Sequence, residues 1–328
     1  MTGEPSPTSW RSAARVALVA ALSFAIAGAV GHAVLGVLRE GARPSTALDP
    51  KLLALAATLW SLGIAAQGPR WAAMLPTPRP SIAQSALAVL ATNTLTVTVP
   101  GPSGEAMLAA YADRALGIPW ATAASATLIA RLLGLGLVGI LLFVGVAALP
   151  GLHQWQTAAA VTLGISGAAL AAYLLVSGRA QPIVAALDAR LARHLPPKLA
   201  DRLRSVLRDA LTPGLHTRSD WARAVSWSLL STVLMAAGGY TSACAAHLSP
   251  APLAYFWMHV ATAIAGVVAF VVPAGLGAID ALWVGLFVAT GHSAAAGVLA
   301  AVAWRQMQAL ALLISVGPLL WISKKAAG

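Results

Sequence analysis

Long apolar runs alternate with short polar, basic segments along most of the chain. Six of the apolar runs are long enough to cross a bilayer as a helix, which takes about 20 residues. The first run is too long for a signal-peptide core of about 7–15 residues, so we expect it to be an uncleaved span. The predicted spans are 16–38, 51–67, 119–149, 156–176, 221–246 and 294–322.

Two further apolar segments are each divided into two pieces by a Pro/Gly break. The second pieces have 12 and 13 residues, too short at about 1.5 Å per residue to cross a core of about 30 Å. The sequence therefore predicts two re-entrant hairpins, each entering and leaving on one side of the membrane. Their pieces are 81–99, 105–116, 251–272 and 278–290, and the residues at the breaks include Pro100, Gly104, Pro273 and Gly277.

The basic residues indicate the orientation of this arrangement. With six crossings and two hairpins, sixteen of the 21 Lys and Arg residues lie on the side of the N-terminus, whereas only Arg39, Arg43 and Lys51 lie on the other side. An excess of Lys and Arg marks the cytoplasmic side. We therefore expect a multi-pass protein of the plasma membrane with both termini in the cytoplasm.

Composition supports an all-α membrane protein. Hydrophobic residues make up 59% of the chain and charged residues 9%, against about 25% charged in soluble domains. The net charge of +11 is explained by basic loops, and no nucleic-acid partner is expected, because that would need a soluble basic domain. The one cysteine, Cys244, excludes an intramolecular disulfide and a thiolate metal cluster.

The two hairpin regions share the order Val-Pro, Gly, acid, Gly, Arg at an offset of about 174 residues. Three crossings per half turn the second half upside down relative to the first. Inverted repeats with broken helices near the midplane are typical of secondary transporters. We interpret 1–328 as one membrane domain with halves 16–149 and 156–322. The copies run Val99-Pro100, Gly104-Glu105, Gly117, Arg131 and Val272-Pro273, Gly277, Asp280, Gly291, Arg305.

Each copy contains one acid and one arginine at membrane depth. A charge at the bilayer centre costs roughly 2.5–3.5 kcal/mol, so these residues should be paired or hydrated. Pairing within each half joins Glu105 to Arg131 and Asp280 to Arg305, and a crossed pairing is equally allowed. The pairs either hold each hairpin against its span or bind an anionic lipid headgroup, since arginine binds phosphate bidentately. Asn93 is a further candidate for the lining of such a site.

The segment 177–220 is the longest polar stretch and carries apolar residues at helical spacing opposite a row of arginines. Two arrangements fit it equally: amphipathic helices on the membrane surface, or a linker packed on the protein. It is also a candidate docking segment for a cytoplasmic enzyme partner.

No metal-ligand spacing, phosphate-binding loop or nucleophile motif occurs in the chain. We therefore expect no metal, no cofactor and no catalytic residue, and favour a transporter over an enzyme. The alternative is a membrane-embedded glycosyl- or acyl-transferase that uses a lipid-linked donor, with Glu105 or Asp280 as general base.

These motifs resemble the transmembrane region of the lysylphosphatidylglycerol synthase family, which is described as flippase-like. The resemblance implies a flippase for a lipid with a phosphate headgroup: a phospholipid, an aminoacyl-phospholipid or a lipid-linked sugar. It does not imply synthetase activity, because we find no soluble synthetase domain. The chain departs from the family pattern at the second acid, which is aspartate where the family usually has glutamate. The matching residues are Asn93, Pro100, Gly104, Glu105 and Arg131, then Pro273, Gly277, Asp280 and Arg305.

Overall fold

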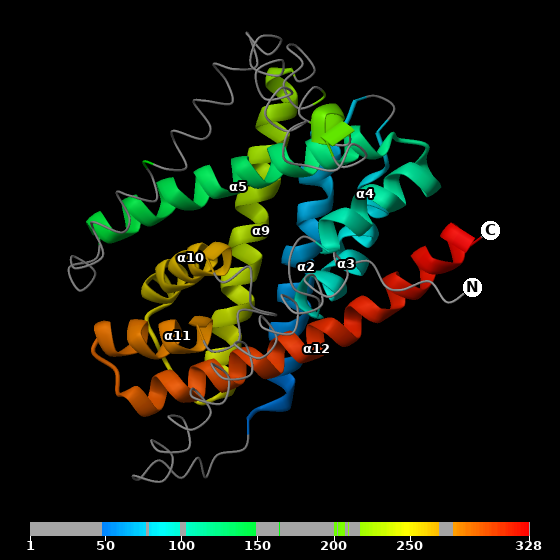
Figure 1. Ribbon diagram of the computed structural model, residues 1–328. Helices are drawn as coiled ribbons and strands as arrows, with labels where there is room; N and C mark the ends of the chain where they lie inside the picture. Colours follow the sequence, from blue (N-terminus) through cyan, green and yellow to red (C-terminus); the bar gives the residue numbers. More distant parts are fainter. Residues whose placement is uncertain are drawn as a thin grey trace, which may run out of the picture.

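The computed structural model describes residues 48–76, 79–98, 103–148, 164, 200–201, 203–206, 209, 217–268 and 278–327. Within these ranges the regular structure is entirely α-helical (Figure 1). The predicted span 16–38, all of the predicted span 156–176 except residue 164, most of segment 177–220, and the break residues Pro100, Pro273 and Gly277 lie outside them. The helices are α2 (Pro50–Ala73), α3 (Ile82–Thr98), α4 (Ser103–Leu116), α5 (Trp120–Ala148), α9 (Arg218–Ala245), α10 (Pro252–Val268), α11 (Ala278–Ala289) and α12 (Ala294–Ala327).

Three of these helices are long and apolar enough to cross a membrane: Pro50–Ala73, Trp120–Gly145 and Ala294–Pro318. Large apolar side chains cover their outer faces; Phe143 is 47% and Leu313 69% exposed. Such a surface is unfavourable in water and suits contact with lipid chains. The protein is therefore an all-α membrane protein. The 28-residue α9 is long enough to cross, but the serines, threonines and glycines along it make it less apolar than these three.

The end of α2 differs from the prediction. The span was expected to stop at Gln67, but the helix continues through Pro69 to Ala73. A proline inside a helix costs about 3 kcal/mol, whereas burying one large apolar side chain contributes about 1.5–3 kcal/mol. Trp71 and Met74 are each only 2% exposed, so their packing offsets the proline. As a consequence, Arg70 belongs to α2 and not to a loop.

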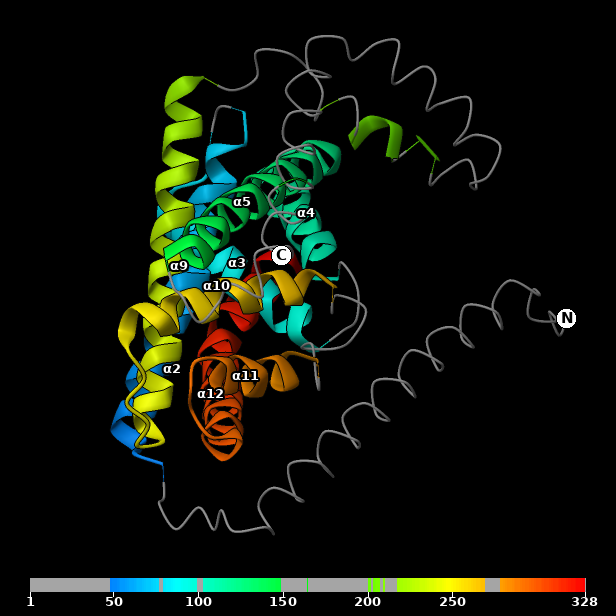
Figure 2. The same cartoon turned by 90° about the vertical axis from the view of Figure 1, so that its left-hand side faces the viewer.

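Helices α2 and α9 form an antiparallel pair along one side of the molecule (Figures 1 and 2). The Asp49 N–H donates to the Ala245 carbonyl at 2.9 Å, and the Ser231 hydroxyl donates to the Gly63 carbonyl at 2.8 Å. A Cβ at Gly238 would lie 2.8 Å from the Ala56 carbonyl oxygen. Small residues thus bring the two backbones into direct contact, as in other membrane helix pairs.

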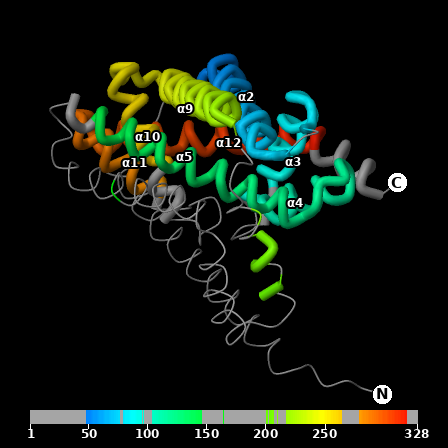
Figure 3. The backbone as a smooth tube through the Cα atoms, turned by 90° about the horizontal axis from the view of Figure 1, so that it is seen from above, coloured from blue at the N-terminus to red at the C-terminus, as the bar shows by residue number. Residues whose placement is uncertain are grey.

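The contacts between helices repeat in the two halves. Helix α3 packs on α2, α4 and α12, and its counterpart α10 packs on α9, α11 and α5. Figure 1 shows α3 and α4 on one side of the α2–α9 pair and α10 and α11 on the other, and seen from above α2 and α9 lie along one edge (Figure 3). The helices α2 and α9, which hold corresponding places in the two predicted halves, run in opposite directions. The inverted repeat itself stays a prediction from the sequence.

Two glycines close the short helices of the two halves in the same way. Gly117 follows α4 with φ of 66°, and Gly291 follows α11 with φ of 85°. Among the described residues these are the glycines with positive φ, a conformation that side chains other than glycine rarely adopt. The repeated glycines therefore reverse the chain between each short helix and the long helix that follows.

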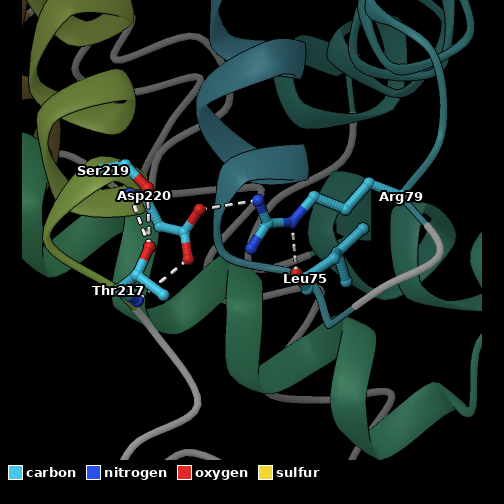
Figure 4. Close-up of polar contacts among 5 residues, drawn as sticks. All are labelled: Leu75, Arg79, Thr217, Ser219 and Asp220. Carbon is cyan, nitrogen blue, oxygen red and sulfur yellow. Dashed lines mark hydrogen bonds and ion pairs between the residues drawn. The ribbon is translucent and has the colours of Figure 1, made fainter.

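An ion pair fixes the start of α9 to the segment between α2 and α3 (Figure 4). Arg79 donates from Nη1 to Asp220 at 2.6 Å and from Nε to the Leu75 carbonyl at 2.7 Å. Asp220 forms a capping box with Thr217, just before the predicted span. The hydrogen bond from Arg79 lowers the pKa of the Asp220 carboxyl well below its usual range; burial opposes this shift and the bonds to Thr217 support it.

Gly238→Ala should destabilise the α2–α9 contact. The added methyl group would press on backbone atoms of Ala56 and Trp60, which cannot move aside as a side chain can. We expect a loss of about 1–3 kcal/mol, seen as a lower unfolding temperature in detergent. The control is Gly285→Ala, because a Cβ at Gly285 meets no atom within 4 Å. Equal effects of the two substitutions would contradict the assigned contact.

Asp220→Asn should lower the free energy of unfolding by about 2 kcal/mol near neutral pH. A carboxyl with a lowered folded-state pKa stabilises the protein above its unfolded-state value of about 3.9, and loses this contribution as the pH falls toward the folded-state value. The difference from wild type should therefore be constant above about pH 5 and shrink below about pH 4. Asp201→Asn, at an acid that is 68% exposed, should have no measurable effect at any pH.

Candidate functional site

The first acid–base pair joins a short helix to a long one. Glu105 lies in the first turn of α4, and its Oε1 forms an ion pair with Nη2 of Arg131 on α5. The Arg131 side chain is 44% exposed and that of Glu105 18%. The second carboxylate oxygen, Oε2 of Glu105, is buried and has no hydrogen-bond partner within the described ranges. This pair therefore keeps an unused acceptor.

The second pair repeats the design with tighter geometry. Asp280 lies in the first turn of α11. Arg305 on α12 donates to it from Nε at 2.8 Å and from Nη2 at 2.9 Å, and its Nη1 donates to Gln308 at 3.0 Å. Of the two pairings allowed by the sequence, the structure has the one within each half. The bidentate contact satisfies both carboxylate oxygens, which suits a buried pair.

A cavity of ≈ 100 Å³ lies between α2, α3, α4 and α5, and we call it the first cavity. It brings together the predicted residues Asn93, Gly104, Glu105 and Arg131, whereas the Asp280–Arg305 pair lies outside it. Thr92, Thr96 and Thr127 also line it, together with Ile64, Gln67, Arg70, Trp71, Val89, Leu108 and Ala130.

Gly104 allows α4 to start directly against α3. A Cβ at this position would overlap the Thr96 side chain and lie 2.8 Å from the Thr92 carbonyl oxygen. Only glycine fits such a close approach, because any larger residue would push the start of α4 away from α3. The close approach of α4 to α3 at Gly104 therefore places the next residue, Glu105, at the wall of the first cavity.

Arg70 also lines the first cavity, although the sequence did not predict this position. Its Nη2 donates to Gln67 at 3.3 Å, while its Nε is buried without a partner in the described part of the chain. No carboxylate within the described ranges forms an ion pair with it. The sequence carried no signal for this position, because an arginine after Gly68-Pro69 looks like the cytoplasmic end of a span.

Gly134 makes room for the Arg70 guanidinium. It lies on α5 one turn after Arg131, and a Cβ built on it would be 2.9 Å from Nη1 of Arg70. Arg70 on α2 thus reaches α5 one turn away from Arg131. With Glu105 as the acid of the first cavity, two guanidinium groups face one carboxylate there, which favours an anionic ligand.

The second half lacks this extra charge. At the offset of 174 residues the counterpart of Arg70 is Cys244, which is uncharged, and Asp280 and Arg305 neutralise each other. No group of His, Cys, Asp and Glu in the described residues could hold a metal ion. The first cavity therefore offers a ligand arginine donors together with hydroxyl and amide groups.

Comparison with known proteins gives one match. The family model described as "Lysylphosphatidylglycerol synthase TM region" matches residues 13–315. No curated protein and no solved structure matches the chain.

A double-mutant cycle should separate the two ion pairs. With Asp280→Asn, Arg305→Gln and the double variant, we expect a coupling energy of about 2 kcal/mol, because the contact is bidentate and shielded. Glu105→Gln and Arg131→Gln should couple by roughly 1 kcal/mol or less, since Arg131 is the more exposed arginine. Unfolding of the purified variants in detergent measures both values. A larger coupling in the first pair would contradict the described geometry.

Proposed function

The chain belongs to the lysylphosphatidylglycerol synthase TM region family, and on that premise we propose that it is a flippase for a lipid with a phosphate-containing headgroup. The headgroup enters the polar interior while the acyl or polyprenyl chains stay in the membrane. A phospholipid, an aminoacyl-phospholipid and a lipid-linked sugar all share the phosphate on which this proposal depends.

The proposed arrangement in the plasma membrane has six crossings, two re-entrant hairpins and both termini in the cytoplasm. The lengths of the helices support it: α4 with 14 residues and α11 with 12 residues are too short for a core of about 30 Å. The 29 and 34 residues of α5 and α12 exceed what a perpendicular crossing requires, as expected for tilted spans.

The observation that carries the proposal is the group of three charged side chains that lines the first cavity: Arg70, Glu105 and Arg131. Arg131 and Arg70 offer donors to a phosphate, and the ion pair with Glu105 holds the Arg131 guanidinium in place when no lipid is bound. The start of α4 adds backbone N–H groups near Glu105. In the inverted half, Asp280 and Arg305 would take the corresponding part when the site opens to the other side.

The alternative is a membrane-embedded glycosyl- or acyl-transferase with a lipid-linked donor. Its support is the unpartnered Oε2 of Glu105, which lines the first cavity and is free to accept a proton from an acceptor hydroxyl. The two functions differ in their products. Covalently modified lipid in membranes that contain the protein would favour the transferase, whereas an unchanged lipid in the opposite leaflet would favour the flippase.

A leaflet-translocation assay in proteoliposomes tests the proposal. Arg131→Ala, Arg305→Ala and Arg70→Gln should each slow translocation of anionic phospholipids about tenfold or more, because a charge-assisted contact contributes about 1.5–3 kcal/mol. The control is Arg114→Ala, at an exposed position on α4, which should translocate like wild type.

Unfolding temperatures of the same preparations show whether each variant is folded. Translocation at the wild-type rate by folded Arg131→Ala and Arg305→Ala would refute the assignment of the site. Absence of translocation by wild type across phosphatidylglycerol, phosphatidylinositol, an aminoacyl-phospholipid and a polyprenyl-linked sugar would refute the flippase function itself.

A further inference from the structure

A second cavity of ≈ 270 Å³ adjoins the first. Gln67 and Arg70 line both cavities, so the Arg70 guanidinium lies where the two meet. An engineered cavity of about 150 Å³ admits benzene, so the second cavity has room for a six-membered ring with its substituents. A ligand with an anionic group at Arg70 could therefore extend into this space.

The second cavity is mostly apolar, with hydroxyl and amide groups on its wall and almost no charge. Hydroxyl and amide side chains from α2, α9, α10 and α12 line it: Gln67, Ser228, Ser231, Thr232, Thr262 and Gln308. Arg70 is its charged lining residue among those that the structure describes, and no carboxylate is among them. Asp280 lies next to the lining residue Ile279, but Arg305 occupies both of its oxygens. A cationic group would find no counter-charge in this cavity.

Two residues that line the second cavity each have a buried polar atom without a partner. His259 is 4% and Trp304 3% exposed, and Nδ1 of His259 and Nε1 of Trp304 have no hydrogen-bond partner within the described residues. Both rings pack against Trp60, at centroid distances of 5.8 and 4.5 Å. A buried polar group without a partner is costly. Hydroxyl groups of a ligand would supply an acceptor for the indole N–H and a partner for the imidazole.

From this geometry we infer that the second cavity takes an uncharged, hydroxyl-bearing headgroup, a sugar or polyol, whose phosphate lies between Arg70 and Arg131. The inference rests on the proposed function and narrows its substrate class. Phosphoglycolipids and polyol phospholipids fit the two cavities. An aminoacyl headgroup such as lysyl does not, because its ammonium group would lie near Arg70 without a carboxylate partner.

Measuring lipid binding tests this inference independently of whether the protein transports lipid. Purified full-length protein in detergent is mixed with phosphatidic acid, phosphatidylinositol or lysylphosphatidylglycerol, and the rise in unfolding temperature reports affinity by linkage. We expect phosphatidylinositol to stabilise the protein most, phosphatidic acid less, and lysylphosphatidylglycerol least.

Trp304→Phe keeps an aromatic ring but removes the indole N–H donor and some side-chain volume, and the control below loses the same volume. Trp304→Phe should weaken phosphatidylinositol binding about fivefold, the value of one hydrogen bond, and leave phosphatidic acid binding unchanged. Trp283→Phe is the matched control, because Trp283 is fully buried in the same aromatic cluster and its Nε1 is also unpartnered, but it lines neither of these cavities. It should leave the ratio of the two affinities unchanged.

The outcomes are distinct. Preferred binding of lysylphosphatidylglycerol, or an equal change of the ratio in Trp304→Phe and Trp283→Phe, overturns the inference even if lipids are translocated. Selective binding of phosphatidylinositol without translocation of any lipid supports the assignment of the cavity and refutes the flippase function. Arg70→Gln should weaken all anionic lipids alike, and a change confined to phosphatidylinositol would overturn the placement of the phosphate.

Discussion

The direct backbone contact between α2 and α9 is the interaction on which the rest of the described structure depends. Gly63 and Gly238 remove the side chains that would separate the two helices, and the Ser231 hydroxyl bonds to the Gly63 carbonyl across the gap. In a membrane, where helices gain little from the hydrophobic effect on association, such close packing is the main attractive force. The helix pairs α3–α4 and α10–α11 both pack around this contact, so the two halves share one interior.

The charged residues of the site are arranged symmetrically in the two ion pairs, but their net charge is not. Each half supplies an acid at the start of a short helix and an arginine on the following long helix, so that each acid has an opposite charge beside it within its half. Arg70 breaks this symmetry, because it enters from α2 and its counterpart on α9, Cys244, is not a basic residue. Arg70 lines both cavities and places a net positive charge where they meet. The charge difference between the two halves follows from this one residue.

Much of the helical framework was predictable from the sequence. The expected pieces 81–99, 105–116 and 278–290 correspond closely to α3, α4 and α11, because Pro/Gly breaks end helices wherever they occur. The end of α2 was predicted wrongly, since the burial of Trp71 and its neighbours overcomes the local effect of Pro69. Local signals decide a helix end only where tertiary packing does not compete with them.

The sequence by itself determined that the protein lies in a membrane, because hydropathy belongs to single residues. It also predicted that two halves repeat and that four charged residues need partners, because the energy of a buried charge likewise belongs to single residues. Only the tertiary structure decided that Glu105 pairs with Arg131 and Asp280 with Arg305, and that Arg70 points into the protein where two cavities meet. Partner choice depends on which helix faces pack together, and that is a property of the whole fold that no single segment of the chain encodes.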